Sequence, residues 1–303
     1  MSDGEFANVN GSIAPLDRAT VSVNDHGFLY GDGVYETVRT YDGRPFLVER
    51  HLERLERSAA AIRLRLPWSR LDLAGEIDRT LAAVRGAGGA GEFAIRIMTT
   101  RGPGPLGYDP DLCPRPTLVI LARFLKPVPI EDREIGIAAI VAGVRRNPIE
   151  ALDPRIKSTN LLNNILAAQQ AKDAGAAEAI LCNTAGFLAE GTLTNVFFVK
   201  DGAVRTPSLD CGILSGVTRD LLLELGPRGG LTFEQGRYRA EDLSEADEIF
   251  VTSTTREILP VALLDGRPVG SGSRGPITQR LQVLFRRRVA EMSGGAAGPA
   301  GGP

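Results

Sequence analysis

A turn, a lysine and a helix follow one another between Asp153 and Gly175, in the stretch D-P-R-I-K-S-T-N-L-L-N-N-I-L-A-A-Q-Q-A-K-D-A-G. Asp-Pro predicts the turn, and the apolar spacing that follows predicts the helix. The apolar positions of that helix are Leu161, Leu162, Ile165 and Leu166. Lys157 lies between turn and helix, in a chain with only four lysines against 31 arginines. A lysine can lose its proton and add to a carbonyl, whereas a guanidinium cannot. Lys157 is therefore either a Schiff-base lysine or a charge at the helix start.

The composition is that of a soluble globular protein, with 303 residues, 43% hydrophobic and 24% charged. This length accommodates two domains with a core in each. A formal charge of −2 argues against a general nucleic-acid binder despite the many arginines. Apolar runs such as Leu118 to Ala122 suit a buried strand and are far too short for a membrane span.

The few cysteines and histidines argue against a metal site. Cys113, Cys182 and Cys211 are odd in number and lack metal-ligand spacing, and the chain has only two histidines to add. The start, M-S-D-G-E-F, has neither a basic nor an apolar segment, so it does not read as a secretory signal. These features predict a reduced, cytoplasmic enzyme without a metal ion.

Residues 6–48 read as short strands joined by turns at Asn10-Gly11, Asp32-Gly33 and Asp42-Gly43. The segment from Val34 to Tyr41 alternates in character. One face carries Tyr35, Thr37 and Arg39, and the other carries Val34, Glu36 and Val38. The first face either lines a pocket for an anionic ligand or is the wet face of a sheet.

Two helices and two strands are predicted to complete the first domain. The helices span about 49–64 and 70–85, and the strands span 93–100 and 117–124. The stripe of the first helix is Leu52, Leu55, Ala59 and Ile62. His51 and Arg54 share another face of this helix, and spacing alone indicates solvent exposure for both. The loop between the strands, R-G-P-G-P-L-G-Y-D-P-D-L-C-P-R-P, is too rich in Gly and Pro for regular structure, and an ordered loop of that length is usually functional.

The predicted domains are a small α+β domain over 1–126, a linker over 127–136, a larger domain over 137–292 and a disordered tail over 293–303. In the larger domain we expect strands at 178–182, 187–189, 247–252 and 258–264, a hairpin turning at Asp201-Gly202, and a last helix over 276–292. Gly216 opens a further helix with a stripe at Leu221, Leu222 and Leu225.

Two stretches of the larger domain have groups suited to an anion. The loop-to-helix start Ser215–Thr218 presents backbone N–H groups, an arrangement that binds phosphate but also occurs with no ligand. Ser253, Thr254 and Thr255 are three hydroxyls directly after a strand, and they either bind an anion or form a turn. A lysine nucleophile, a phosphate site and a carboxylate are what pyridoxal phosphate requires.

From about Val9 to Arg287 the chain resembles the class IV (fold type IV) pyridoxal-phosphate aminotransferases. This family includes branched-chain aminotransferases, D-amino acid aminotransferases and aminodeoxychorismate lyases. The matching motifs, in order, are G-D-G-V-Y-E-T-V-R, H-L-E-R-L, I-K-S-T-N-L-L-N-N, E-G-T-L-T-N-V-F, L-S-G-V-T-R and T-S-T-T-R-E-I-L-P-V. The resemblance implies a two-domain α+β fold of the D-amino acid aminotransferase type, with pyridoxal 5'-phosphate in the interdomain cleft and the site near the interface of a homodimer.

The same resemblance assigns residue roles. Lys157 matches the Schiff-base lysine, which also carries a proton between the substrate and the cofactor. Glu190 matches the carboxylate that pairs with the pyridine nitrogen, and Arg54 matches the phosphate-binding arginine. The remaining cofactor contacts are expected from Ser215, Gly216, Val217, Thr218, Ser253 and Thr254. The expected substrate contacts are Tyr35, Arg39, Arg96, Tyr108 and Thr255, with Tyr108 reaching across the dimer.

The subfamily stays open, because the sequence departs from each pattern. Branched-chain enzymes usually have a tyrosine where Leu161 and Leu162 stand, although the Gly/Pro-rich loop resembles their archaeal type. D-amino acid enzymes have Arg-x-His where this chain has Leu106 and Tyr108, although S-T-T-R-E-I fits that group. E-T-V-R and T-P-S-L-D-C-G-I-L resemble the lyases.

The leading interpretation is transamination between a branched-chain L- or a D-amino acid and a 2-oxo acid such as 2-oxoglutarate. The alternative is aminodeoxychorismate lyase, which forms 4-aminobenzoate and pyruvate. A more remote alternative is an inactive homologue that acts as a binding protein. The absorbance of a purified holoenzyme separates this last alternative from the other two.

Overall fold

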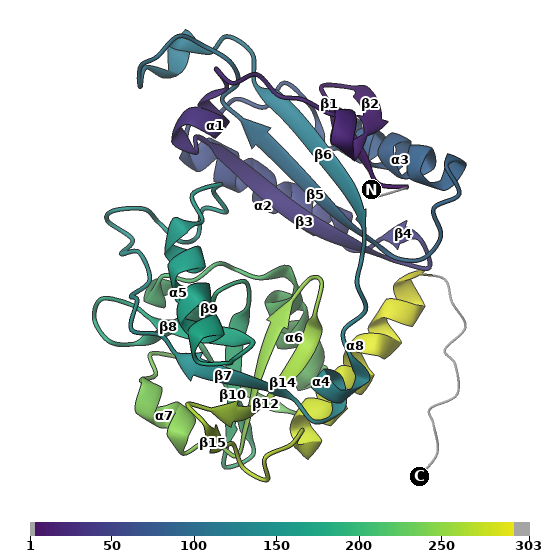
Figure 1. Ribbon diagram of the computed structural model, residues 1–303. Coiled ribbons are helices and arrows are strands. Elements are labelled where there is room, and N and C mark those ends of the chain that lie inside the picture. Colours follow the sequence, from purple (N-terminus) through teal and green to yellow (C-terminus); the bar gives the residue numbers. More distant parts are fainter. Residues whose placement is uncertain (1–3, 294–303) are drawn as a thin grey trace. The chain divides into compact units, whose positions relative to one another are not determined.

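The computed structural model describes residues 4–293, and the chain divides into two units. The N-terminal unit comprises the chain up to Lys126 together with Ile156–Asn160. The C-terminal unit comprises Pro127–Arg155 together with the chain from Leu161. Each unit is built on a β-sheet with helices packed beside it (Figure 1), so the fold has the predicted α+β class.

The segment assignments differ from the predicted domains in two places. The predicted linker 127–136 contains the helix α4 (Ile130–Glu134), which packs on the sheet of the C-terminal unit. Ile156–Asn160 lies inside the predicted second domain, 137–292, yet it belongs to the N-terminal unit because its backbone bonds to a strand there. The predicted tail 293–303 lies outside the described residues, apart from Ser293 at the end of a helix.

The sheet of the N-terminal unit is antiparallel, with strand order β2-β1-β6-β5-β3-β4. Its strands are β1 (Phe6–Val9), β2 (Ser12–Pro15), β3 (Gly33–Tyr41), β4 (Arg44–Pro45), β5 (Phe93–Thr100) and β6 (Thr117–Phe124). β5 and β6 have the predicted bounds. Val34 and Val38 of β3 are buried in the core, as their alternation predicts, while Tyr35 and Arg39 on the opposite face are also buried. That second face is therefore not simply the solvent-exposed face of the sheet.

Two long helices, α2 (Val48–Ala61) and α3 (Arg70–Gly86), lie behind the sheet in Figure 1 and form the core with it. Leu52, Leu55 and Ala59 of α2 enter that core as predicted. The predicted exposure of His51 and Arg54 is wrong, because both are buried against Glu36 of β3. This face of α2 packs against the Glu36 side chain of β3 and not against solvent.

A short helix, α1 (His26–Tyr30), precedes the predicted turn at Asp32-Gly33: Asp32 follows the helix C-cap, Gly31, and Gly33 is the first residue of β3. Asp25 caps the start of α1 by accepting from the Gly27 N–H, and Gly31 ends it at φ 69°. Single 3₁₀ turns occur at Leu16–Arg18 and, within the long Gly/Pro-rich loop, at Pro110–Leu112. Local capping by Asp25 and Gly31 therefore stabilises a short helix that was not predicted.

The sheet of the C-terminal unit has the order β12-β11-β10-β13-β14-β7-β8-β9, with β15 paired to β14. Its strands are β7 (Ile137–Val141), β8 (Glu178–Cys182), β9 (Leu188–Gly191), β10 (Asn195–Lys200), β11 (Ala203–Pro207), β12 (Thr232–Gly236), β13 (Glu248–Ser253), β14 (Glu257–Leu264) and β15 (Arg267–Pro268). The hairpin of β10 and β11 turns at Asp201-Gly202, as predicted. β9 begins one residue later than predicted and extends to Gly191.

Besides α4, the helices of this unit are α5 (Leu162–Asp173), α6 (Val217–Arg228), α7 (Ala240–Ser244) and α8 (Pro276–Ser293), with a 3₁₀ turn at Leu209–Cys211. The helix predicted after Lys157 is present as α5, but its apolar residues are not the buried ones. Leu162, Ile165 and Leu166 are 45–67% exposed, and the buried positions are Ala167 and Ala171. Among the described residues, no helix combines the length and apolarity needed to span a membrane.

Candidate functional site

Lys157 is held on the N-terminal unit by its own backbone. Its carbonyl accepts from the Tyr35 N–H at 2.9 Å, and its N–H donates to Ser58 Oγ at 3.1 Å. Ser158 forms an antiparallel bridge with Val34, which attaches the segment to the start of β3. The helix α5 begins only at Leu162, so the backbone of Lys157 is held by the N-terminal unit and not by the helix. Lys157 is therefore not a charged residue of the first helical turn.

The Lys157 side chain faces an aromatic ring that also binds an arginine. Its Nζ lies 4.6 Å from the centre of the Tyr35 ring, and the Arg96 guanidinium carbon lies 3.9 Å from that same centre. Tyr35 is 4% exposed. The structure therefore brings three predicted residues together, two of them positively charged groups on one buried ring.

Two other predicted substrate residues of this unit make contacts elsewhere. The Arg39 guanidinium stacks on Tyr41 at 3.9 Å and donates from Nε to the Thr40 carbonyl. Tyr108 is 89% exposed and packs edge-on against Tyr30, with 5.2 Å between ring centres. Neither contact involves Lys157, so the substrate roles of these two side chains stay predictions.

Arg54, the predicted phosphate ligand, belongs to a buried network with Glu36 and His51. Arg54 donates from Nε and Nη2 to the two oxygens of Glu36, at 2.6 and 2.9 Å. His51 Nδ1 lies 2.7 Å from Glu36 Oε2. Glu36 is fully buried, and His51 and Arg54 are 1% and 5% exposed. The fork-shaped pairing fixes the plane of the Arg54 guanidinium.

Burial and charge act in opposite directions in this network. Burial by itself raises the pKa of Glu36, but the charge of Arg54 and the hydrogen bonds from Arg54 and His51 outweigh it and hold that pKa well below its usual range. Burial lowers the pKa of His51, and the positive charges of Arg54 and Lys157 lower it further against the opposing effect of Glu36. The network therefore contains an ionised carboxylate and a neutral imidazole that donates from Nδ1.

Glu190 lies on β9 of the C-terminal unit and is 5% exposed. Arg146 Nε donates to its Oε1 at 2.8 Å, and the Leu214 N–H donates to its Oε2 at 2.9 Å. Arg146 also donates to Asn163 Oδ1 at 3.0 Å. A carboxylate oxygen has more than one acceptor site, so both oxygens can accept a further proton donor. The arginine compensates the buried charge.

The predicted anion site at the start of α6 depends on Gly216. The helix begins at Val217 with Gly216 as its N-cap, and no side-chain cap is present there among the described residues. A Cβ on Gly216 would lie 1.9 Å from Asn195 Oδ1, so any other residue here requires Asn195 or the helix start to move. Asn195 also donates to the Leu214 carbonyl, which joins the helix start to the loop that holds Glu190. Thr218 is 6% exposed, whereas Ser215 Oγ donates to Asp220.

The predicted hydroxyl cluster forms the turn between β13 and β14. Ser253 Oγ accepts from the Arg256 N–H at 3.2 Å, and Thr254 and Thr255 lie within that turn. The preceding residue, Thr252, pairs with Asn195 in the sheet. Asn195 thus touches both the α6 start and the strand leading to this cluster. The tertiary structure brings the two predicted anion-binding stretches to one end of the C-terminal unit.

Sequence reasoning missed three supporting residues. Glu36 could have been found from the sequence, since a carboxylate between two inward-facing valines requires a buried partner. Ser58 and Arg146 could not have been found in this way, because they are 99 and 44 residues away in sequence from their partners Lys157 and Glu190.

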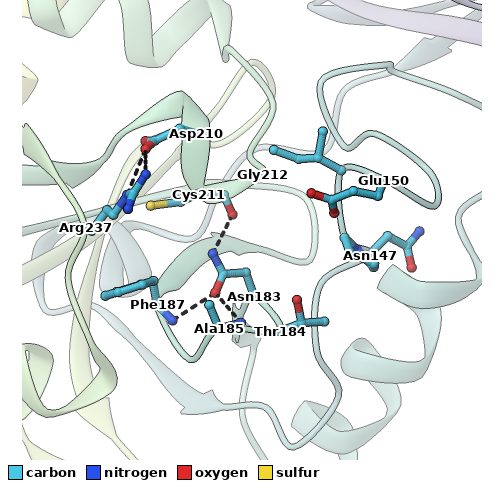
Figure 2. A pocket seen from close by; sticks show the side chains of 12 residues that line it. Asn147, Glu150, Asn183, Thr184, Ala185, Phe187, Asp210, Cys211, Gly212 and Arg237 are labelled. Carbon is cyan, nitrogen blue, oxygen red and sulfur yellow. Dashed lines mark hydrogen bonds and ion pairs between the residues drawn. The ribbon is translucent and has the colours of Figure 1, made fainter.

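A separate hollow of about 230 Å³ lies in the C-terminal unit and contains none of the predicted site residues. Figure 2 shows Asn183 within it and the Asp210–Arg237 ion pair at one side. Asn183 is fully engaged with the neighbouring backbone, because it donates to the Cys211 carbonyl and accepts from the Ala185 and Phe187 N–H groups.

Comparison with known proteins gives a consistent result. The family model described as "Amino-transferase class IV" matches residues 33–264. A putative branched-chain-amino-acid aminotransferase of Methanocaldococcus jannaschii is 40% identical over 92% of this chain and 94% of its own length. A D-alanine aminotransferase of Bacillus licheniformis is 34% identical, covering 92% and 95%. The aminodeoxychorismate lyase of Bacillus subtilis is 35% identical, covering 94% of both chains.

The structural comparison agrees with the sequence comparison. The crystal structure of the branched-chain aminotransferase from the thermophilic archaeon Thermoproteus uzoniensis with norvaline superimposes with a TM-score of 0.86. The two chains are 30% identical, and the match covers 94% of this chain and 95% of the other. A second branched-chain amino acid aminotransferase, with the same TM-score and identity, is complexed with N-(5'-phosphopyridoxyl)-L-glutamate.

Proposed function

The chain belongs to the class IV aminotransferase family, and from that premise we propose that it is a pyridoxal-phosphate-dependent aminotransferase. It moves an amino group between an amino acid, branched-chain L- or D-, and a 2-oxo acid such as 2-oxoglutarate. The observation that carries this proposal is the placement of Lys157, whose amine lies over the Tyr35 ring while its backbone is fixed on both sides.

The residues present fit the cofactor. Lys157 offers a primary amine for a carbonyl, and Glu190 offers a buried carboxylate for a ring nitrogen. The start of α6, where Gly216 is the N-cap and provides no side-chain cap, suits a phosphate, as does the fixed Arg54 guanidinium. When bound, pyridoxal phosphate supplies the carbonyl that takes up the amino group and a ring that withdraws electrons from the substrate α-carbon.

The chain's own groups bind and move protons around that chemistry. Lys157 Nζ holds the cofactor and, once released, moves the proton of the substrate α-carbon, because a neutral amine can act as a base. Glu190 keeps a proton at the ring nitrogen through its negative charge, which Arg146 holds in place. Val217, Thr218 and Thr254 donate hydrogen bonds to phosphate, and Ser215 and Ser253 shape the backbone of these two stretches.

Arg96 is the best candidate for binding the substrate carboxylate. Its guanidinium stacks on the same buried ring as the Lys157 amine, so one side chain, Tyr35, contacts both groups. Arg39, Tyr108 and Thr255 remain proposed contacts of the substrate side chain or of the second acid. Since two arginines suit a dicarboxylate, 2-oxoglutarate is the proposed amino acceptor.

Aminodeoxychorismate lyase is the second candidate, supported by the 35% identity to the Bacillus subtilis lyase over 94% of both chains. A lyase consumes one doubly anionic substrate and never takes a second keto acid, whereas a transaminase shows ping-pong kinetics. These kinetics separate the two reactions.

We further propose a cytoplasmic homodimer. The apolar side chains Leu162, Ile165 and Leu166 of α5, with Leu193 in the turn that Asn164 binds, form an exposed patch suited to a second copy. Light scattering after gel filtration measures the assembly.

The test of the proposed function is a substrate panel with the cofactor-loaded enzyme. L-leucine, L-valine, D-alanine and D-glutamate are each mixed with the enzyme, and absorbance follows conversion of the cofactor to its amine form. Aminodeoxychorismate is assayed in parallel for pyruvate. Conversion by an aliphatic L-amino acid supports the branched-chain reaction, and conversion by D-alanine supports the D-specific one. Pyruvate from aminodeoxychorismate without any conversion by amino acids would replace transamination by the lyase reaction.

Borohydride reduction tests the role of Lys157 in the same preparation. We expect reduced cofactor on Lys157 and total loss of turnover in Lys157→Ala and Lys157→Arg, because the guanidinium cannot add to the carbonyl. Label found on Lys126, Lys172 or Lys200 instead contradicts the assignment.

A further inference from the structure

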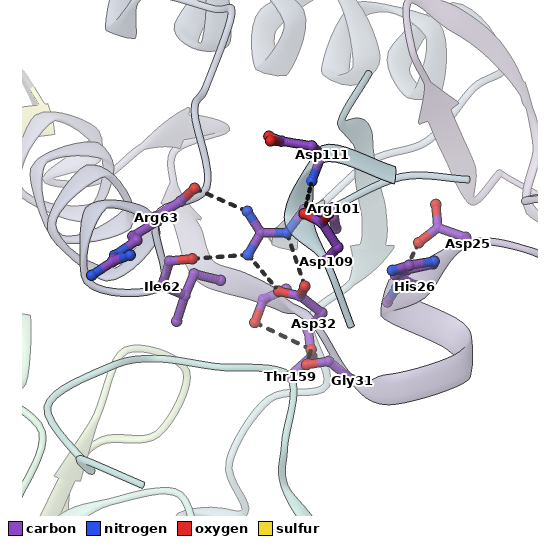
Figure 3. A network of polar contacts seen from close by, with 12 residues as sticks. Asp25, His26, Gly31, Asp32, Ile62, Arg63, Arg101, Asp109, Asp111 and Thr159 are labelled. Atoms are coloured by element: carbon purple, nitrogen blue, oxygen red, sulfur yellow. Dashed lines mark hydrogen bonds and ion pairs between the residues drawn. The ribbon is translucent and has the colours of Figure 1, made fainter. Parts of the chain in front are cut away.

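Arg101, directly after β5, is a buried arginine that the proposed chemistry does not use. It is 6% exposed and makes four side-chain hydrogen bonds (Figure 3). Its Nε and Nη2 donate to the two oxygens of Asp32 at 2.8 and 3.0 Å. Its Nη2 and Nη1 also donate to the carbonyls of Ile62 and Arg63 at 2.8 and 2.9 Å. One guanidinium therefore joins two separate parts of the N-terminal unit.

The first of these parts is the C-terminal end of α2. The helix ends at Ala61, and Arg63 follows in the left-handed region at φ 53°. The last carbonyls of a helix lack intrahelical partners and carry partial negative charge, so a cation there is favourable. Ser58 belongs to the same end of α2, and its hydroxyl accepts the Lys157 N–H. The position of this helix end thus determines where the Lys157 N–H is held.

The second part is the glycine-flanked loop that contains Asp32. The Gly31 carbonyl accepts from Thr159 Oγ1 at 2.7 Å and from Asn160 Nδ2 at 2.8 Å. The Gly33 carbonyl accepts from the Thr159 N–H at 2.9 Å. These bonds, with the Tyr35 N–H to the Lys157 carbonyl, also hold the segment Ile156–Asn160. Figure 3 shows Thr159 against Gly31, next to Asp32.

We propose that Arg101 is a positioning residue for Lys157. By its ion pair with Asp32 and its bonds to the end of α2, it holds these two parts, which both bind Ile156–Asn160, in a fixed relative position. The inference rests on the proposed function, because it matters only if the Lys157 amine reacts. Four bonds in one plane require the guanidinium fork, which a lysine ammonium cannot reproduce. A shift of the reacting amine by about 1 Å can cost roughly 100-fold in rate.

The experiment compares Arg101→Lys with the wild type and with a matched control, Arg79→Lys. Arg79 also joins a carboxylate, Glu76 at 2.6 Å, to a loop carbonyl, Gly11 at 3.2 Å, within the same unit, and both of these contacts lie outside Ile156–Asn160. Two quantities are measured: hydrogen exchange of the cofactor-free protein, and kcat and KM of the loaded enzyme.

In Arg101→Lys we expect exchange in peptides covering Tyr35 and residues 156–160 to rise about tenfold. Exchange in β6 stays unchanged. We expect kcat to fall about 10- to 100-fold with KM for the amino donor within about twofold, because positioning and not binding is lost. Arg79→Lys changes neither quantity. Asp32→Asn keeps the contacts of Arg101 to α2 and changes both quantities in the same direction but less.

Normal exchange over residues 156–160 in Arg101→Lys overturns the proposal, as does faster exchange there with unchanged kcat. Equal acceleration throughout the N-terminal unit overturns it too, because Arg101 is then merely structural. If Arg101→Lys does not fold, Asp32→Asn decides by the same criteria. A wild type that neither takes up cofactor nor transaminates defeats the proposed function, whereas the exchange comparison still decides whether Arg101 holds the segment.

Discussion

Glu190 is the residue at which charge, rather than shape, carries the proposed chemistry. Its two oxygens accept from Arg146 and from the Leu214 N–H inside the C-terminal unit. An amide at this position keeps nearly the same shape but can accept only one of these two hydrogen bonds, because its NH2 group faces a donor. The substitution that separates charge from shape is Glu190→Gln.

We predict that Glu190→Gln loses at least about tenfold in kcat, equivalent to about 1.4 kcal/mol of barrier, while the cofactor stays bound. The negative charge that favours a proton on the ring nitrogen is gone, yet the volume is nearly preserved. Half-reaction kinetics and absorbance of the dialysed variant measure the two effects. Loss of an ion-pair partner also leaves Arg146 uncompensated, so Arg146→Met/Glu190→Gln serves as a control for folding. Near-normal turnover of Glu190→Gln would contradict the role.

At the scale of elements, the pairing of β3 with α2 determines how the N-terminal unit responds to acid. The Glu36 carboxylate projects from β3 toward α2 and binds His51 and Arg54, one helical turn apart. Both Glu36 and His51 have pKa values below their ordinary values of 4.5 and 6.5 in the folded chain. In each case the unfolded chain takes up a proton that the folded chain does not.

We predict that the N-terminal unit loses stability as pH falls. The loss begins below pH 6.5, where unfolded His51 is protonated, and steepens below pH 4.5, where unfolded Glu36 is protonated. Trp68, the one tryptophan of the sequence, packs against the core of this unit, so its fluorescence in urea reports the unit selectively. His51→Gln should remove the part of the loss above pH 4.5. A stability that does not change as the pH is lowered through the ordinary pKa of histidine would show that the network is not formed.

A second prediction at this scale concerns the start of α6. Gly216→Ala places a Cβ 1.9 Å from Asn195 Oδ1, so either the Asn195 side chain or the first turn of the helix must move. We expect weaker cofactor retention, measured as a raised Kd in absorbance titrations. Gly75→Ala in α3 is the matched control, because nothing lies within 4 Å of its Cβ. That control should stabilise the fold by about 0.5–1 kcal/mol and leave the Kd unchanged. An unchanged Kd in Gly216→Ala would remove α6 from the proposed site.

At the scale of the whole molecule, the reactivity of the buried thiols can be used to follow the unfolding of each unit. Cys113 belongs to the N-terminal unit, and Cys182 and Cys211 belong to the C-terminal unit; all three are buried and free. Burial raises the pKa of each thiol, which leaves little reactive thiolate.

We predict that a thiol reagent labels the native protein only slowly and labels three cysteines in denaturant. Mass spectrometry during unfolding then assigns each labelled thiol to its unit. Immediate labelling of a native cysteine would contradict the burial. Incomplete labelling in denaturant would show that a disulfide had formed.

The sequence by itself determined the elements whose signals are local. Turn residues and alternation predicted β5, β6, β8 and the hairpin at Asp201-Gly202, and the Gly216 helix start was predicted for the same reason. Local signals failed where a partner distant in sequence decided the outcome. His51 and Arg54 were expected to be exposed, and a carboxylate on β3 buried them. The apolar residues of α5 predicted the helix itself, but the sheet packs on its alanines.

The candidate site divides in the same way. The residue types of Lys157, Glu190 and Gly216 were recognisable in the sequence because motifs of adjacent residues carry them. Only the tertiary structure determined which side chains hold them, since Arg101 and Asp32 are 69 residues apart and Arg146 and Glu190 are 44 apart. Nor does any local pattern place Ile156–Asn160 on the first unit. Hydrogen bonds between distant segments form only when folding brings the segments together, so no periodicity or turn propensity in the chain encodes them.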